Sequence, residues 1–195
     1  MRIIGGTAGG RTLVAPSGMR TRPTQDYVRE SLFNILRGEV VDAEVLDLFA
    51  GSGALALESV SRGAQCAVLV DRAPAAMQAA RRNVATLGFD AQCACMGCDW
   101  QTALSRCQAQ GLRFSLVFLD PPYDLHCLNA VADALHARCL LRPDALLVLE
   151  HRHGDTPQLP APYAQEDARR YGDTGITFYR WEGTADAQGD LPGQL

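Results

Sequence analysis

The sequence predicts an α/β fold: a mostly parallel, seven-stranded sheet with helices on both faces and a small N-terminal extension. From residue 45 onwards, short apolar runs rich in β-formers alternate with longer segments of helical periodicity. This succession requires parallel strands joined by helical crossovers. Residues 166–171 and 175–181 are two further strand-like runs with a short connection, which predicts an antiparallel pair at one edge.

The first 37 residues are predicted to form a ribbon followed by a helix. Residues 3–4 and 11–14 are apolar and are separated by two glycine pairs, a pattern typical of a small hairpin. After an extended connector, Thr24 is a fair N-cap for a helix to about Leu36. Arg29 is predicted to face away from the apolar stripe, free to meet solvent, phosphate or a cofactor carboxylate. That stripe comprises Val28, Leu32, Ile35 and Leu36.

The alternating region is predicted to run from residue 38 to 182, followed by a polar, disordered tail over 183–195. Its predicted strands are 45–50, 66–71, 91–96, 115–119, 145–150, 166–171 and 175–181. Its predicted helices are 51–62, 74–87, 100–109 and 125–138.

Charge is distributed unevenly along the chain. Residues 1–37 contain six arginines against Asp26 and Glu30, whereas the whole chain has a net charge of -4. A basic arm therefore precedes an acidic body, and a phosphate-rich partner would bind the arm. The absence of a membrane-length apolar run and of a signal-peptide pattern predicts a cytoplasmic protein, and seven cysteines without disulfide spacing agree with reduced thiols.

The stretch Asp120-Pro121-Pro122-Tyr123 ends an apolar strand and carries the first functional signal. Two prolines must stop the strand, which leaves a carboxylate, an unpaired carbonyl and an aromatic ring at its carboxyl end. An exocyclic amine of a nucleobase could donate to Asp120 and the Pro121 carbonyl while its ring stacks on Tyr123. The same residue types are also ordinary in a strand-end turn.

A glycine turn indicates a nucleotide-like cofactor. Gly51 and Gly53 open a predicted helix in a G-x-G-x-x-A pattern, and Asp71 follows about 20 residues later, as in NAD sites. Asp47 argues against NAD, because a carboxylate near the turn repels a pyrophosphate but attracts a cationic amino acid moiety. S-adenosylmethionine carries such a moiety, and Asp99 after the third strand could accept from its adenine amine.

These motifs together resemble those of the RsmD-type 16S rRNA guanine-N2 methyltransferases over residues 1–182. The resemblance implies the Rossmann-like fold of S-adenosylmethionine-dependent methyltransferases and transfer of a methyl group to guanine N2 in 16S rRNA (family site guanine 966). The matching stretches are 2–6, 22–24, 28–30, 32–34, 47–55, 61–64 and 120–123.

The resemblance and the charge pattern together predict the site residues. The target base would be held by Asp120, Pro121, Pro122 and Tyr123. S-adenosylmethionine would be bound by Asp47, Phe49, Gly51, Ser52, Gly53, Asp71, Arg72, Cys98, Asp99 and Asp120. RNA would contact Arg11, Arg20, Arg22 and Arg29. The expected partner is 16S rRNA or a small-subunit assembly particle bound by a monomer, with no metal and no membrane.

Two other functions remain open from the sequence. Tyr123 stands where many relatives have Phe, and this ending also occurs in adenine-N6 methyltransferases, which usually carry an additional target-recognition domain. A nucleic-acid-binding module with a vestigial cofactor site is disfavoured by the intact set of acids and glycines.

Cys93, Cys95 and Cys98 have metal-like spacing, but without a second ligand pair they are interpreted as small apolar residues. His151 and His153 are interpreted as surface-loop histidines.

Overall fold

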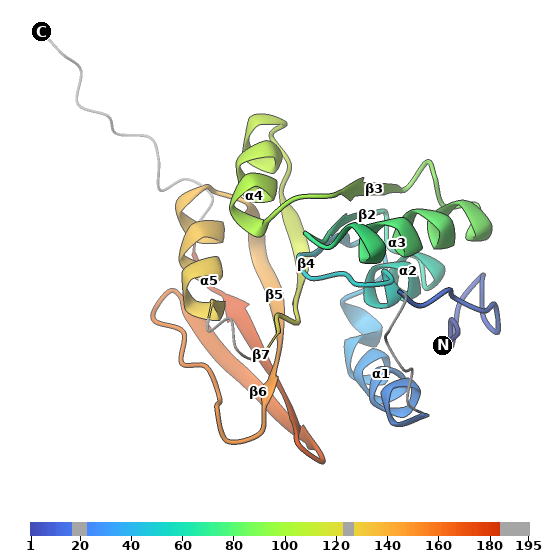
Figure 1. The fold of residues 1–195 in the computed structure, drawn as a ribbon. Coiled ribbons are helices and arrows are strands. Elements are labelled where there is room, and N and C mark those ends of the chain that lie inside the picture. The colour runs from blue at the N-terminus through green and yellow to red at the C-terminus, as the bar shows by residue number, and fades with distance from the viewer. Residues whose placement is uncertain (17–22, 123–126, 184–195) are drawn as a thin grey trace, which may run out of the picture.

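The computed structural model describes residues 1–16, 23–122 and 127–183, with the side chains of 23–25 excepted. One seven-stranded sheet has the order β3-β2-β1-β4-β5-β7-β6, and helices cover both of its faces (Figure 1). Strands β1 to β5 pair in parallel, whereas β7 is antiparallel to both β5 and β6. The predicted fold class is therefore confirmed.

The helices and strands lie close to their predicted positions. The strands are β1 (Glu44–Asp47), β2 (Cys66–Val70), β3 (Cys93–Met96), β4 (Phe114–Leu119), β5 (Leu141–Arg152), β6 (Tyr163–Tyr171) and β7 (Thr174–Trp181). The helices are α1 (Pro23–Ile35), the 3-10 helix η1 (Leu36–Gly38), α2 (Ala54–Ser61), α3 (Pro74–Leu87), α4 (Trp100–Ala109) and α5 (Leu128–Ala137). Strand β5 is longer than expected at both ends: it begins at Leu141, which pairs with Phe114 of β4, and its last residues keep pairing with β7 as far as Arg152 with Thr174.

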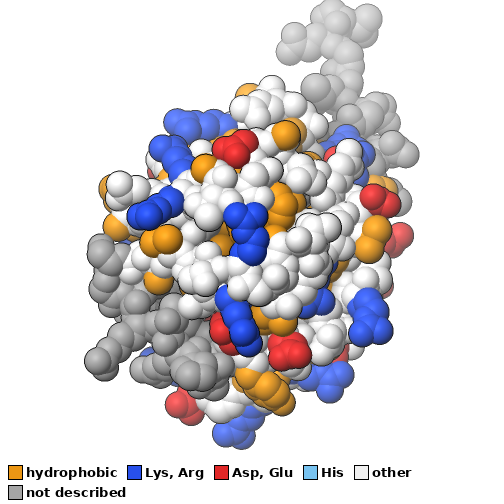
Figure 2. All heavy atoms as spheres, turned by 90° about the vertical axis from the view of Figure 1, so that its right-hand side faces the viewer, with side chains coloured by type: hydrophobic (Ala, Val, Ile, Leu, Met, Phe, Trp, Pro, Cys, Tyr) orange, Lys and Arg blue, Asp and Glu red, His pale blue; other side chains and the backbone are white. Residues whose placement is uncertain are grey.

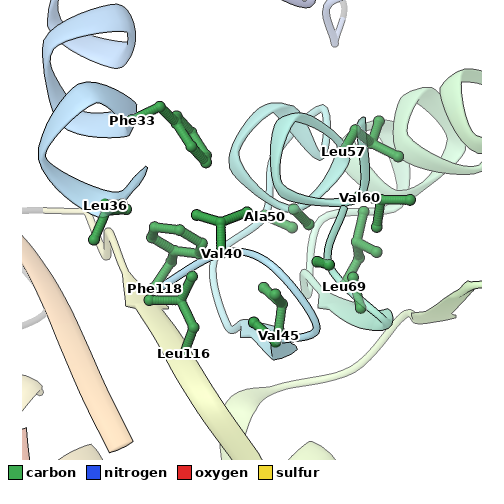
Figure 3. Packing of buried hydrophobic residues seen from close by; sticks show 14 of the residues in the cluster. Phe33, Leu36, Val40, Val45, Ala50, Leu57, Val60, Leu69, Leu116 and Phe118 are labelled. Carbon is green, nitrogen blue, oxygen red and sulfur yellow. The ribbon is translucent and has the colours of Figure 1, made fainter. Parts of the chain in front are cut away.

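Two cores lie on opposite faces of the sheet, because successive strand residues point to opposite sides. On one face, Phe118 and Val148 pack with residues of α1, α2 and α3. On the other face, Leu119 and Leu149 pack with residues of α4 and α5. Figure 3 shows the first core, where Phe33 reaches from α1 towards Phe118, the two ring centroids lying 6.1 Å apart.

The stripe predicted for α1 is correct except at one position. Ile35 is 40% exposed, whereas Phe33 is fully buried. The helix is rotated relative to the prediction because Phe33, and not Ile35, meets the aromatic ring of Phe118 in the sheet. An aromatic ring contributes more buried apolar area than isoleucine does, so the packing follows Phe33.

The predicted N-terminal ribbon is a short hairpin that packs against α2. Its two arms are joined by hydrogen bonds such as the one from Ile3 N to Arg11 O, at 2.9 Å. Thr7 N donates to Ser61 O at 2.7 Å, and a Cβ on Gly6 would lie only 1.8 Å from that carbonyl oxygen. Only glycine allows this close approach, and Gly6 also has a positive φ of 76°. The arm is therefore part of the same core as the sheet.

Arg29 does not face solvent as predicted. Its side chain is only 5% exposed, and it donates to Asp26 Oδ1 at 3.1 Å and to the carbonyl of Arg2. Its Nε also lies 4.0 Å from Oε2 of the fully buried Glu58. Burial of a guanidinium requires such partners. Asp26 lies one turn away in α1, but the Arg2 carbonyl and Glu58 could not be foreseen from the sequence, because they come from the hairpin and from α2.

No helix among the described residues is both long and apolar enough to cross a membrane.

Candidate functional site

Four carboxylates lie at or near the carboxyl ends of four adjacent strands, on one edge of the sheet. Asp47 ends β1, Asp71 and Asp120 directly follow β2 and β4, and Glu150 lies two residues before the end of β5. Asp47 pairs with Leu69 of β2 and with Phe118 of β4, and paired residues of parallel strands point to the same face. Side chains alternate between faces, so Asp71 and Asp120, two residues after Leu69 and Phe118, also point to that face. Glu150 joins them, because it follows Leu149 as Asp120 follows the paired Leu119. This edge includes the switch point between β1 and β4, where open α/β sheets bind ligands.

Asp47 is buried, and no ion pair to a described residue compensates its charge. Its side chain is 1% exposed, and within the described part of the chain its Oδ2 has no hydrogen-bond partner. Burial and the neighbouring carboxylate of Asp120 raise the pKa of Asp47 from 3.8 to about 7, and Asp71 contributes in the same direction. An unpaired buried oxygen of this kind fits a cationic ligand such as the ammonium of S-adenosylmethionine.

The glycine turn is held by the second acid. Gly51 N donates to Asp71 Oδ2 at 2.9 Å, and the other oxygen of Asp71 accepts from Ala73 N at 2.8 Å. Gly53 adopts the left-handed conformation, with φ at 82°, immediately before α2, and a Cβ there would approach Leu69 Cδ2 to 2.6 Å. The turn therefore requires glycine at this position for both backbone and packing reasons.

Asn83 connects the glycine turn to the N-terminal arm. This buried amide of α3 donates to the carbonyls of Ser52 and Val14, both at 2.9 Å, and accepts from Val14 N at 2.8 Å. Sequence reasoning missed Asn83, because its partners lie 31 and 69 residues away.

The remaining predicted cofactor residues lie on the loops that follow these strands. Phe49 is half-buried after β1, Arg72 is exposed after β2, and Cys98 is half-buried after β3. Asp99 caps α4 by accepting from Thr102 N at 2.8 Å and from Thr102 Oγ1 at 2.9 Å. These hydrogen bonds lower the pKa of Asp99, which stays ionised. Its proposed contact with adenine would have to coexist with this cap.

A pocket of about 350 Å³ lies against Pro121 and Pro122. Residues 127–129 from the start of α5 and residues 150–152 from β5 complete much of its wall. The volume is in the range of small-ligand sites. Burial raises the pKa of Asp120, directly before these prolines, to about 6. Tyr123, predicted to stack on the base, lies outside the described residues.

Glu150 is a second site residue that sequence reasoning missed. It lines this pocket at the carboxyl end of β5, and burial together with the carboxylate of Asp120 raises its pKa to about 8. The signal was present in the sequence, because Glu150 ends a predicted strand as Asp71 and Asp120 do.

His151 is not a surface-loop residue. It is 6% exposed, and its Nε2 lies 2.8 Å from Oγ1 of the buried Thr177. The prediction was wrong because β5 extends two residues further than its apolar run, which places His151 within the sheet. His153, after the strand end, is exposed.

The other predicted binding residues have mixed surroundings. Arg11 is exposed and donates to the Thr86 and Leu87 carbonyls at the end of α3, whereas Arg20 and Arg22 lie outside the described residues. The three cysteines of the metal-like pattern are half-buried, and the described residues contain no group of His, Cys, Asp or Glu arranged to hold a metal ion.

Comparisons with known proteins agree on one family. Residues 1–180 match the family described as Conserved hypothetical protein 95. Ribosomal RNA small subunit methyltransferase D of Escherichia coli (strain K12) is 35% identical over 191 residues, covering 97% of this chain and 94% of that protein. A solved Escherichia coli structure, named provisionally as the methyltransferase yhhF, has a TM-score of 0.82 and 32% identity, covering 93% of this chain and 98% of that one.

A more distant structure shows the fold alone. An RNA methyltransferase of Salinibacter ruber in complex with S-adenosyl-L-homocysteine is 13% identical with a TM-score of 0.62, covering 91% of this chain and 99% of that one.

Proposed function

Because the chain belongs to the family of ribosomal RNA small subunit methyltransferase D, we propose that it transfers a methyl group from S-adenosylmethionine to N2 of a guanine in small-subunit rRNA. The resemblance predicted from the sequence is thereby confirmed at the level of the family. The observation that carries the proposal is the edge where the unpaired Asp47 lies beside Asp120 and its proline pair.

The residues present fit S-adenosylmethionine, which supplies an electrophilic methyl group when bound. Asp47 would pair with its ammonium group, because this carboxylate is buried and has an unsatisfied oxygen. Asp71 would accept from the ribose hydroxyls, since it lies at the end of the adjacent strand. The turn around Gly51 and Gly53 leaves room for the ligand to approach the backbone.

Asp120 and the Pro121 carbonyl would act on the target amine. The lone pair of guanine N2 is delocalised into the ring, so the amine is a poor nucleophile. Two hydrogen bonds to these acceptors favour a pyramidal nitrogen and stabilise the positive charge that develops during attack. Asp120 need not be a strong base, because the methylated nitrogen releases its proton readily. Holding the amine in line with the methyl group supplies much of the rate.

The basic arm is the proposed RNA-binding surface, since a pocket for one flipped base offers few contacts. Arg11 is exposed on the hairpin. Figure 2 shows the side of the molecule with α3 and the N-terminal segment, over which arginine side chains are spread. Replacing Arg11, Arg20 and Arg22 by Gln should weaken RNA binding and reduce its salt dependence by up to about three counterions. An unchanged salt slope would place the RNA surface elsewhere.

The substrate is tested by incubating the protein with labelled S-adenosylmethionine and separated small- and large-subunit RNA or particles. Digestion to nucleosides should give N2-methylguanosine from small-subunit material. N6-Methyladenosine would instead support the adenine-N6 alternative, and label on large-subunit RNA alone would contradict the proposed substrate. A parallel titration of NAD should show no tight binding.

A further inference from the structure

Glu150 has no role in the methyl transfer outlined above, yet it lies where the target base would bind. Leu119 pairs with Leu149 across the parallel β4–β5 ladder, so the next residues, Asp120 after β4 and Glu150 within β5, lie side by side. Neighbouring strands are about 4.8 Å apart. Phe118 and Val148 belong to the same core and therefore point to the same face. Asp120 and Glu150 come two residues later in each strand, so they also share that face.

The carboxylate of Glu150 has no partner among the residues that the structure describes. No hydrogen bond to it comes from the residues that the structure describes, and the charge that acts on it is the acid Asp120. Its backbone is firmly held, because β5 pairs with β4 on one side and Glu150 is opposite Ile176 of β7 on the other. A ligand that compensates two adjacent carboxylates must present adjacent hydrogen-bond donors, whereas an anion such as phosphate would be repelled.

Guanine and adenine differ in this respect. The Watson–Crick edge of guanine presents the N2 amine and N1–H, two adjacent donors. The corresponding edge of adenine presents the N6 amine next to N1, which is an acceptor. One carboxylate with a carbonyl can hold either amine, but a second carboxylate beside it favours a base with a donor at N1.

We propose that Glu150 is a specificity-determining residue that accepts the N1–H of the target guanine, while Asp120 and the Pro121 carbonyl accept from the N2 amine. This inference rests on the proposed function, since it assumes that the pocket receives a base for methylation. Above about pH 8, where Glu150 is ionised, an adenine would place its N1 lone pair against this carboxylate, and the repulsion disfavours adenine. The wall of the pocket therefore contributes to the choice of base as well as to its position.

The test uses a base that keeps the reacting amine but changes N1. An RNA fragment is made with the guanine that the wild type methylates, and a second fragment carries 2-aminopurine there, which has the same amine but an acceptor at N1. The wild type should methylate guanine with a kcat/KM about 10- to 100-fold higher than 2-aminopurine, as expected for one charge-assisted hydrogen bond.

The variant Glu150→Gln should lower this preference at least about tenfold, because its amide can donate to the acceptor of 2-aminopurine. The preference is a ratio measured within one variant, so a reduced folded fraction does not change it. Asp90→Asn, an exposed acid outside the pocket, is the control and should keep the wild-type ratio.

The outcomes separate the two proposals. If the wild type forms no N2-methylguanosine in any small-subunit RNA, the proposed function fails. If it forms N2-methylguanosine but Glu150→Gln keeps the wild-type preference, the role of Glu150 alone is overturned.

Discussion

Asp47→Asn should stabilise the unliganded protein in a pH-dependent way while weakening cofactor binding. Burial, with a smaller contribution from Asp120, raises the pKa of Asp47 from 3.8 to about 7. The folded state therefore prefers the protonated acid more strongly than the unfolded chain does, and stability is lost as pH rises from about 4 through 7. A pKa raised by about three lowers the free energy of unfolding by about 4 kcal/mol once Asp47 is fully ionised in the folded state.

The pH dependence separates the effect of the Asp47 charge from other effects of the asparagine side chain in the variant. The raised pKa of Asp47 lowers the free energy of unfolding of the wild type by about 2 kcal/mol at pH 5 and by about 4 kcal/mol at pH 8. Any packing or hydrogen-bonding cost of asparagine is the same at both values. The difference in free energy of unfolding between Asp47→Asn and the wild type should thus be about 2 to 3 kcal/mol larger at pH 8 than at pH 5. This corresponds to about 5–10 °C in Tm.

Thermal or urea unfolding at the two pH values measures this gain, with Asp90→Asn, an exposed acid, as the control. Calorimetry should show S-adenosylmethionine affinity reduced at least about tenfold in Asp47→Asn, because a charge-assisted contact is lost. A variant whose stability relative to wild type does not change with pH, and which binds the cofactor normally, would refute the assignment of Asp47.

Three other predictions follow from the same site and its support. Asp120→Asn should reduce single-turnover methylation by about 100-fold or more while S-adenosylmethionine affinity, measured by calorimetry, stays near wild type, since this acid is proposed to contact the base. Wild-type turnover would disprove that role. At saturating cofactor, proposed to pair with Asp47, methylation should fall as pH drops from about 8 to 6, because the accepting carboxylates of Glu150 (pKa about 8) and Asp120 (pKa about 6) become protonated. Glu150→Gln should move the fall towards pH 6, and a flat profile would contradict this. Glu58→Gln should cost about 3–5 kcal/mol and increase hydrogen exchange in the hairpin, because the buried Glu58 accepts from Ile4 N and Gly5 N and is an anionic partner of Arg62 and Arg29. Unchanged exchange there would show that the hairpin is held independently.

The sequence was sufficient for the elements whose signals are local. Helix α3 and helix α4 begin and end where their patterns predicted, Pro74–Leu87 and Trp100–Ala109, because proline at N1 and an Asp N-cap act within one turn. The alternation of apolar runs with helices also determined the parallel sheet, and an acid at each strand end indicated the ligand-binding edge.

Tertiary structure decided which of these acids remain unpaired. Asp71 and Asp99 are engaged by nearby backbone N–H groups, whereas Asp47 is left with an unsatisfied oxygen among other carboxylates. This difference depends on burial and on strand register, which join residues 73 positions apart in the case of Asp47 and Asp120. No periodicity in the sequence carries that information.

The same reason explains Arg29 and Glu150. A helical pattern describes the apolar face of α1 but not what the hairpin and α2 place over the rest, so the burial of Arg29 against Glu58 could not be predicted. Glu150 was predicted only as the end of a strand, and its position beside Asp120 required the β4–β5 register. The sequence by itself determined the order of elements and the acids at their ends. Only the folded chain decided which charges are buried together, because burial depends on contacts between segments far apart in the sequence.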